Sequence, residues 1–498
     1  MYTFSSKLKT FAFVLMILGI LGVGYGFFTA PSTIQDVEAI LAEQDHGGHD
    51  AHAVAHPAAA DHSEHTTAQT EKVVEAPVAV ATTDSTMNST ASATILKDTI
   101  SVVSSVATVA PVKTAKVVKK VVVVDEHAEH QAHLEHVLHQ LSNKPWASIY
   151  VAAIFFLLLT MGVLAFYAIQ QVSQAGWSPV LFRVMQGITA YLPVGSVIFF
   201  ILLILSGLHF NHLFVWMDAD VVAGDKLIQN KSGYLNFPFW IARAAIFLIG
   251  WNLYNYYTKK FCLEQDRASD NLYYKKNFKA SAMFLVFFIV SESIMSWDWI
   301  MSVDPHWFST LFGWYVFASF FVSGITVIML VTLYLKNLNL LPHVNTSHLH
   351  DLAKFIFGFS IFWTYLWFSQ FMLIWYANIP EEVTYFITRI EDYQLPFFAT
   401  IGMNFLFPVL ILINTDFKRI SWVLVMAGVV ILLGHYVDFF VMIMPATVGD
   451  QWFFGIAEIG AVLFFLGLFI FVVFTAMAKS PLLPERNPLI EESKHFHY

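Results

Sequence analysis

The sequence predicts an all-α protein that crosses a membrane many times. Of its 498 residues, 57% are hydrophobic and only 13% are charged, whereas a soluble domain carries about 25% charged residues. About ten apolar stretches are long enough to cross a bilayer, which takes about 20 helical residues. A surface that faces lipid explains the shortage of charge. The fold class is therefore a polytopic helical membrane protein.

The predicted spans are bounded by the loss of apolar composition at each end. In chain order they are 11–28, 146–169, 187–216, 237–257, 280–301, 312–335, 352–379, 397–413, 422–444 and 453–478. Lys7 and Lys9 precede the first span, as basic residues precede a signal peptide. The apolar run is long for such a peptide, and Phe28 stands where a cleavage site needs a small residue. We therefore expect residues 1–30 to be an uncleaved anchor.

Positive charge is distributed asymmetrically between the predicted loops. With the N-terminus inside, the short outer loops contain only Lys226, Lys231 and Arg389, and most other basic residues lie on the inner side. Cytoplasmic loops are enriched in Lys and Arg, so we expect both termini to be cytoplasmic. The net charge of −9 is unlike the basic footprint of a nucleic-acid-binding protein.

Residues 31–144 differ from the rest of the chain, because they are rich in Ala, Val, Thr, Ser and His and almost free of aromatic residues. We interpret them as a low-complexity insertion on the outer side. It contains two histidine clusters: His46, His49, His52, His56, His62 and His65, and then His127, His130, His133, His136 and His139. Two interpretations stay open for the clusters, namely weak metal capture and a solvated polar helix or tether.

Ionisable residues inside the predicted spans are the candidates for function, because each costs about 2.5–3.5 kcal/mol to insert at mid-bilayer. All of them fall in the outer halves of their spans. They are Glu292, Arg243, His435, Asp438, His209, His212, Asp298 and Glu458. Together they predict a proton-transfer path or a quinone pocket that opens to the outer phase, although each could instead hold helices together.

The candidates differ in depth and in the partners available to them. Glu292 is the deepest, and Arg243 on the preceding span is the candidate cation for it. If Arg243 is close, we expect Glu292 to be ionised and structural, and if it is distant, we expect Glu292 to be protonated at rest and able to exchange protons with the outer phase. His435 and Asp438 lie at positions i and i+3 of one helix face, where an imidazole and a carboxylate can exchange protons. His209 and His212 are expected on one face near the outer end of the third span.

Redox centres of its own are not expected in this chain. A single cysteine, Cys262, excludes an iron–sulfur cluster, a CxxCH haem attachment and an internal disulfide. Haem b would need facing histidines at matching depth on two helices, but the histidines in the spans lie only at outer ends. We therefore expect no metal and no covalently bound cofactor, and no catalytic residue in the strict sense.

The turn between the fifth and sixth spans carries a distinctive motif. Residues 296–310 read SWDWIMSVDPHWFST. With the ten-span layout, this motif resembles the second quinone-binding-type membrane subunit of alternative complex III, in the NrfD-like, or polysulfide-reductase, family. The resemblance covers about residues 146–478 and leaves out the insertion at 31–144.

The resemblance implies a fold of two four-helix bundles, spans two to five (145–310) and six to nine (311–450), with span one and residues 451–498 peripheral. It also implies a bacterial inner-membrane complex that oxidises quinol and passes electrons through an iron–sulfur protein to c-type haem subunits. A related NrfD-like membrane subunit and a terminal oxidase are further candidate partners. Quinone or menaquinone and lipids are the implied ligands, and no quinone-site residue is transferred.

Three functions remain open on this basis. The first is a membrane subunit of a quinol:electron-acceptor oxidoreductase, which forms the quinone environment or carries protons. The second is a proton-conducting or structural subunit that binds no quinone. The third is a secondary transporter, for which Pro193 with Gly195, and Gly402 with Pro408, would mark broken helices. No inverted repeat is evident, so the transporter ranks last.

Overall fold

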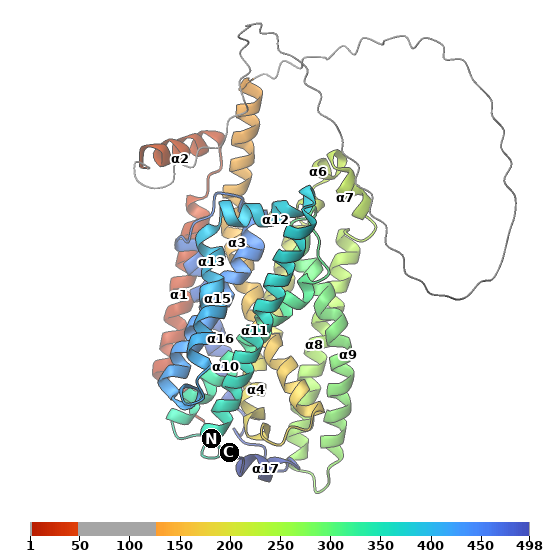
Figure 1. Cartoon of the computed structure of the whole chain (residues 1–498), viewed down its shortest axis with the longest axis vertical. Coiled ribbons are helices and arrows are strands. Elements are labelled where there is room, and N and C mark those ends of the chain that lie inside the picture. The colour runs from red at the N-terminus through yellow and green to blue at the C-terminus, as the bar shows by residue number, and fades with distance from the viewer. Residues whose placement is uncertain (1, 48–125, 498) are drawn as a thin grey trace, which may run out of the picture. The chain divides into compact units, whose positions relative to one another are not determined.

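The computed structural model describes residues 2–47 and 126–497, and these residues form helices joined by loops, with no strand among them (Figure 1). The chain divides into two units, Met1–Leu41 with His130–Tyr498, and Ala42–Glu129. The first unit contains 10 described helices that are long and apolar enough to cross a membrane. These helices confirm the all-α polytopic fold class and each of the ten predicted spans.

The α-helices have the following bounds: α1 Ser6–Thr29, α2 Ile34–Gly47, α3 Glu126–Val172, α4 Phe182–Ile188, α5 Leu192–Gly207, α6 Ala219–Gly224, α7 Lys226–Lys231, α8 Phe237–Gln265, α9 Leu272–Trp299, α10 Phe312–Asn337, α11 Thr346–Ala377, α12 Pro380–Glu391, α13 Gln394–Ile401, α14 Phe407–Leu412, α15 Ser421–Val448, α16 Ile456–Met477 and α17 Ile490–Lys494. Both termini lie at the same end of the helical bundle (Figure 1), as an even number of crossings requires. We call this the N/C end and the other the far end.

The helices α3 and α10 form the centre of the bundle. In their most apolar windows 94% and 89% of residues are buried, against 28–61% in the other spans. The two helices cross at glycines. A Cβ on Gly162 would lie 2.4 Å from the carbonyl oxygen of Phe320, and one on Gly324 would lie 2.7 Å from the amide nitrogen of Val163. Only glycine allows backbones to approach this closely.

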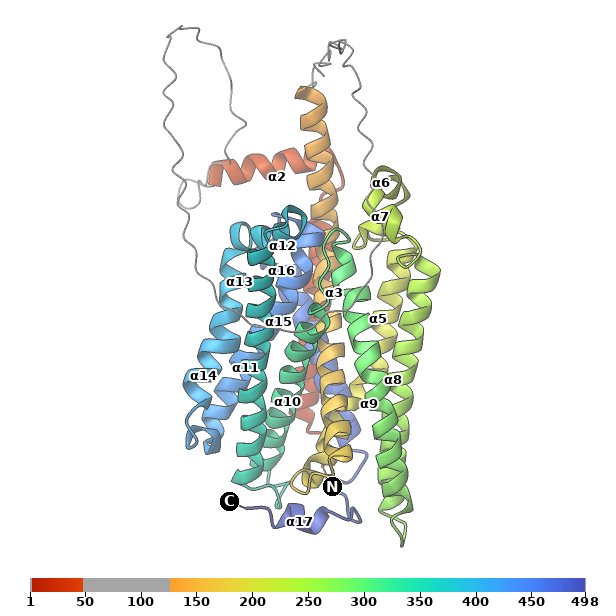
Figure 2. The ribbon, with the colours of Figure 1, turned by 45° about the vertical axis from the view of Figure 1, so that its right-hand side comes forward.

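The remaining spans surround this centre in two groups (Figure 2). On one side α8 packs along both α5 and α9, and on the other α10 packs along α11 and α15, with α13 and α14 between α11 and α15. α9 also packs against α10 and so joins the groups. The grouping agrees with the two four-helix bundles that were predicted.

The helices α1 and α16 form an antiparallel pair at the edge of the bundle. Small residues line the contact: a Cβ on Gly22 would lie 2.9 Å from the Cα of Gly460, and one on Gly26 would lie 2.5 Å from the Cβ of Ala457. Small residues let membrane helices gain van der Waals contact along their length. Spans one and ten are therefore peripheral, as expected.

The third span is displaced along the sequence relative to its prediction. The structure begins it at Pro179 and ends it at Gly207, whereas the prediction was 187–216. Beyond Gly207 the backbone leaves the helix, and His209 adopts a left-handed φ of 60°. His209 and His212 therefore lie in a loop at the far end, and their predicted place on a helix face is wrong.

Both proline positions that were considered as helix breaks coincide with local departures from α geometry. A 3-10 turn, Thr189–Tyr191, precedes Pro193, and a π-helical turn, Gly402–Leu406, precedes Pro408. Proline lacks the N–H that an α-helix needs, so the hydrogen bonding shifts register there. Both spans nevertheless continue through the turn, unlike the broken helices of transporters.

The predicted insertion at 31–144 is helical at its two described ends. α3 continues outward from the second span as far as Glu126, through Pro145, and Val37 of α2 is buried against Leu134 and Val137 of α3. Part of the second histidine cluster therefore lies on a helix. The side chains of His127 and of the whole first cluster lie outside the described residues, as do all residues from 48 to 125.

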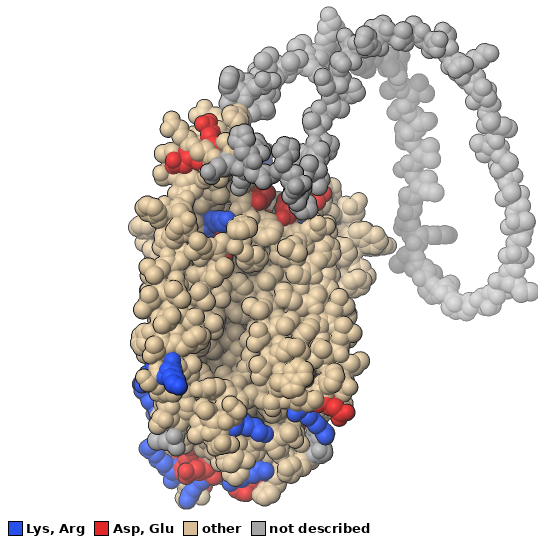
Figure 3. Space-filling view, turned by 90° about the vertical axis from the view of Figure 1, so that its left-hand side faces the viewer, with Lys and Arg blue, Asp and Glu red and all other residues tan. Residues whose placement is uncertain are grey.

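Charge on the described surface gathers toward the ends of the bundle. On the face in Figure 3, Lys and Arg cluster near the N/C end, and a broad, hollowed band between the ends is almost free of charge. Such a band is suited to the hydrocarbon core of a bilayer.

Candidate functional site

Arg243 of α8 forms a buried ion pair with Asp298 of α9. Its Nε donates to Oδ2 at 2.6 Å and its Nη2 donates to Oδ1 at 2.9 Å, a bidentate geometry that adds both strength and direction. Tyr234 donates its hydroxyl to Oδ1 of the same carboxylate at 2.8 Å. The carboxylate is thus fully engaged in joining two helices.

The motif at 296–310 surrounds this ion pair and joins three helices. The carbonyl oxygen of Asp298 accepts hydrogen bonds from Trp240 Nε1 at 2.8 Å and from Ser302 Oγ at 2.6 Å. The carbonyl oxygen of Trp299 accepts one from the hydroxyl of Tyr150, on α3, at 2.7 Å. The described geometry gives this part of the motif a role in helix packing.

Glu292 lies apart from the ion pair, and of the two alternatives open for it, the structure shows the one in which Arg243 is not its cation. The Glu292 side chain is buried with 4% exposure. Its partners are the hydroxyls of two serines on its own helix, Ser293 at 3.2 Å and Ser296 at 3.3 Å. No basic group within the described chain lies at ion-pair distance from Glu292. A carboxyl group in such surroundings is most stable as the neutral acid.

His435 and Asp438 of α15 form the centre of a buried polar cluster in the second bundle. Both residues are at most 1% exposed. Ser319 of α10 links them, because its Oγ lies 3.0 Å from Nδ1 of His435 and donates to Oδ2 of Asp438 at 2.8 Å. The imidazole and the carboxylate themselves are 3.8 Å apart. The predicted pairing of these two residues is confirmed.

Two further residues complete the shell around Asp438. Trp363 of α11 donates its Nε1–H to Oδ2 at 2.8 Å, and Tyr315 of α10 donates its hydroxyl to Oδ1. Residues from three helices therefore converge on one carboxylate. Both carboxylate oxygens of Asp438 accept hydrogen bonds from neutral donors. We call Asp438, His435, Ser319, Tyr315 and Trp363 the Asp438 cluster.

The helix α12 connects the Asp438 cluster to the far end of the bundle. Tyr385 of α12 interacts electrostatically with both Asp438 and Asp304, and its ring stacks on that of Trp307 with centroids 3.8 Å apart. Arg389 lies over the Tyr385 ring and donates to the carbonyl oxygen of Met442 at 3.3 Å. Burial raises the pKa of Tyr385, so this phenol stays protonated. It can therefore relay a proton only by giving up its own proton while it accepts another.

Polar groups without a protein partner lie beside the cluster on its other flank. Nε2 of His435 is buried, and so are the Oδ1 and Nδ2 atoms of Asn404. None of these three atoms has a hydrogen-bond partner among the residues that the structure describes. Asn404 lies in the π turn against Gly434, where a Cβ would be 2.1 Å from its Oδ1. Buried polar groups are seldom left unpaired, so these atoms are sites where water can enter the chain of donors and acceptors.

Glu458 is placed as a helix cap. One carboxylate oxygen accepts the backbone N–H of Gly455 at 2.9 Å, at the start of α16. The other oxygen is buried and has no hydrogen-bond partner within the described ranges, and Tyr436 of α15 interacts with the carboxylate electrostatically. The cap accounts for one oxygen of Glu458, and the structure does not bring Glu458 into the hydrogen-bonded Asp438 cluster.

His209 and His212 line a cavity of about 430 Å³ at the far end, together with His136 and His139 of α3. The rings of His139 and His212 are 5.0 Å apart. Burial, and then the neighbouring His139, lower the pKa of His212. Within the described chain, no group of three or more His, Cys, Asp and Glu side chains is arranged to hold a metal ion.

Sequence reasoning missed several members of this site. Tyr315, Ser319 and Trp363 look like ordinary residues of apolar helices, and Arg389 looks like a loop residue although it is only 3% exposed. The amphipathic pattern of α12 could have identified Arg389 and Tyr385 as members of the site. The two residues are four positions apart and so lie on the same face of the helix.

No known protein-family model matches the chain, and no curated protein matches it either. The geometry of the site is therefore the evidence that bears on function.

Proposed function

We propose that this chain is a membrane subunit of a respiratory quinol:electron-acceptor oxidoreductase, similar to the NrfD-like subunits of alternative complex III, and that its second bundle carries protons. The observation that carries the proposal is the Asp438 cluster. A carboxylate and an imidazole are buried side by side and joined by a hydroxyl, and ionisable groups inside a span are costly to insert.

The cluster has the chemistry of a proton relay. Asp438 accepts hydrogen bonds only from neutral donors, so a proton on His435 would lie next to a carboxylate that stabilises it. Ser319 touches both groups and can pass a proton by donating to one while accepting from the other. Tyr385 and Arg389 extend the polar groups toward Asp304 at the far end, which the distribution of basic residues predicts to be the outer side.

The proposal assigns the electron-transfer centres to partners. A single buried cysteine leaves the chain without ligands for an iron–sulfur cluster. An iron–sulfur protein and c-type haem subunits would take the electrons from quinol, and the bacterial inner membrane would be the location. In this arrangement the chain contributes the quinone environment and the path for protons.

The test is Asp438→Asn in the assembled complex, reconstituted into vesicles with quinol and cytochrome c. We expect the complex to assemble and proton yield or turnover to fall by about 10-fold or more, in the range of a lost acid–base group. Asp450→Asn is the matched control, since Asp450 is exposed after the end of α15 and accepts a hydrogen bond from its neighbour Gln451. Wild-type proton yield and turnover in an assembled Asp438→Asn complex would refute the relay.

A proton-conducting subunit that binds no quinone is the second candidate, because the Asp438 cluster suits it equally well. A photoreactive quinone analogue added to the working complex separates the two. Labelling of this chain, competed away by native quinol, supports the quinone environment. Labelling confined to other subunits, with the Asp438→Asn effect intact, supports the second candidate.

A further inference from the structure

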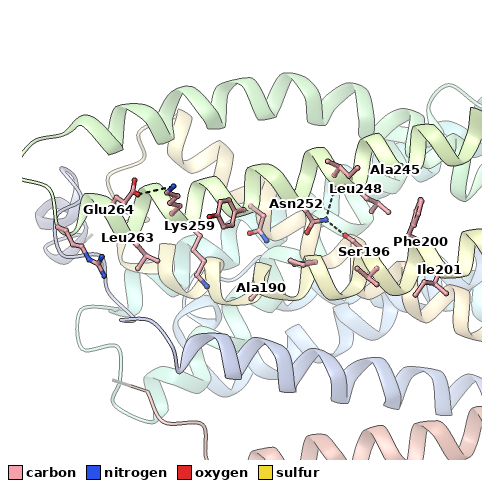
Figure 4. Close-up of a pocket in the computed structure, with 17 residues that line it drawn as sticks. Ala190, Ser196, Phe200, Ile201, Ala245, Leu248, Asn252, Lys259, Leu263 and Glu264 are labelled. Carbon is pink, nitrogen blue, oxygen red and sulfur yellow. Dashed lines mark hydrogen bonds and ion pairs between the residues drawn. The ribbon is translucent and has the colours of Figure 1, made fainter.

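A long groove runs along the surface of the first bundle between α5 and α8 (Figure 4). Its volume is about 860 Å³, near the upper end of the roughly 300–1,000 Å³ range of ligand clefts. Exposed apolar side chains on both helices, among them Val197 and Ile249, border it. The groove is therefore open to the side of the bundle that faces lipid.

The lining changes character along the length of the groove. The part toward the far end is apolar, with Phe200, Ile201 and Leu248. Midway, Asn252 donates its amide to the Ser196 hydroxyl at 2.8 Å and so joins the two walls. Toward the N/C end the lining is basic. Figure 4 shows Lys259 in this part, on α8 beside α5.

The basic end holds an excess of positive charge. Lys259 is half-buried, and the charged groups that act on it most strongly are two further cations, Arg183 and Lys479. Arg183 is neutralised by an ion pair with Asp266, and Lys260 lies 4.0 Å from Glu264. No carboxylate of the described chain lies at ion-pair distance from Lys259.

Arg267 adds to this charge from the turn that directly follows α8. Leu263, one helical turn beyond Lys259 on α8, lines the groove between the two cations. Arg267 also lines the groove and has no ion pair within the described part of the chain. Two cations at the end of an apolar groove call for a ligand with an anionic head and an apolar tail.

We propose that this groove binds one phospholipid with an anionic headgroup. The phosphate would lie between Lys259 and Arg267, and an acyl chain would run along α5 and α8 past the Asn252–Ser196 contact. Lys259 to Leu248 spans eleven residues of helix, or about 17 Å, close to the depth of one leaflet. Basic pockets between spans on the cytoplasmic side bind such headgroups, and this end is predicted to be cytoplasmic.

The chemistry favours this lipid over the other candidate occupants. A free phosphate would leave the apolar part of the groove empty. A quinone would fill the apolar part, but its uncharged head would leave Lys259 and Arg267 unneutralised. The inference does not depend on the proposed function, because it concerns a different bundle and no redox step.

The test is native mass spectrometry of the purified full-length protein in detergent, titrated with dioleoyl-phosphatidylglycerol or with dioleoyl-phosphatidylcholine. We expect one phosphatidylglycerol per chain at an affinity at least about ten-fold higher than that for phosphatidylcholine, a factor that corresponds to about 1.4 kcal/mol. The double variant Lys259→Gln/Arg267→Gln should reduce the preference to less than about two-fold. Equal wild-type affinity for the two lipids would overturn the proposal.

Two controls make the result specific to the groove. Lys275→Gln/Lys279→Gln removes the same charge from exposed positions of α9 and should keep the preference. Val197→Trp leaves all charges in place but fills the apolar part, and should weaken binding of phosphatidylglycerol. Loss of preference in the α9 variant, or full binding in Val197→Trp, would contradict a site in the groove, as would a retained quinone that phosphatidylglycerol fails to displace.

Discussion

At the scale of single residues, the first bundle separates two carboxyl groups into different environments. Asp298 is paired with Arg243, whereas Glu292, six residues earlier on α9, has only serine hydroxyls as partners among the described residues. Burial without a cation favours the neutral acid. The two positions therefore make opposite predictions for substitutions that remove charge.

Replacing Arg243 by Gln should strongly destabilise the protein. The substitution leaves the Asp298 carboxylate buried and uncompensated, which typically costs about 3–5 kcal/mol. The buried Cys262 provides the measurement, since a thiol-reactive fluorophore reports its exposure on heating. Arg243→Gln/Asp298→Asn should recover much of the loss, and a single variant with the wild-type melting temperature would argue against the ion pair.

Glu292→Gln should leave stability within about 1 kcal/mol of wild type, because glutamine reproduces the size and hydrogen bonding of the neutral acid. If Glu292 exchanges protons with the outer phase during turnover, the same variant should assemble normally and lower quinol-driven turnover or the proton yield per electron. Thermal unfolding, followed by the exposure of Cys262, and proton release during turnover are both measured on the same preparation. Unchanged turnover and yield would assign Glu292 to helix packing alone.

At the scale of helices, close crossings organise the bundle. α3 and α10 touch at Gly162 and Gly324, and α1 and α16 touch along small residues. α3 also extends beyond the membrane-crossing part, where α2 packs on it through Val37. The second histidine cluster is thus carried on the extension of a central helix, which explains its helical periodicity.

Gly162→Ala tests the central crossing. The new Cβ would lie 2.4 Å from the carbonyl oxygen of Phe320, so the helices must move apart, at a cost of about 1–3 kcal/mol. Gly358→Ala is the control, because a Cβ at that exposed position of α11 meets nothing within 4 Å and alanine gains about 0.5–1 kcal/mol over glycine in a helix. Equal melting temperatures for the two variants would contradict a tight crossing.

At the scale of the whole molecule, ten spans place both termini on one side of the membrane. The distribution of Lys and Arg predicts that side to be the cytoplasm. A cysteine introduced at Asp304, in a Cys262→Ala background, should react with a membrane-impermeant maleimide added to intact spheroplasts. A cysteine at Lys275 should react only after the membrane is opened. The reverse pattern of labelling would invert the topology.

The sequence was enough to predict the fold class and the spans. Hydrocarbon requires about 20 apolar residues at each crossing, so composition alone marks where the helices run. The grouping of spans into two bundles came from the resemblance carried by 296–310. The pairing of His435 with Asp438 was also predictable, because both residues lie on one helix at i and i+3.

Contacts between helices could not be predicted in this way. Arg243 pairs with Asp298 rather than with Glu292. Asp438 accepts hydrogen bonds from Tyr315, Ser319 and Trp363, which lie on helices distant in the sequence. Both results depend on the rotation and depth of each helix, and packing between helices sets these. His209 and His212 lie in a loop rather than on the predicted helix, because the backbone turns after Gly207. The groove is lined by residues of both α5 and α8, so it depends on how those two helices pack. An apolar pattern shows that a helix is in the membrane, but all-round apolar helices carry little information about which side faces which neighbour.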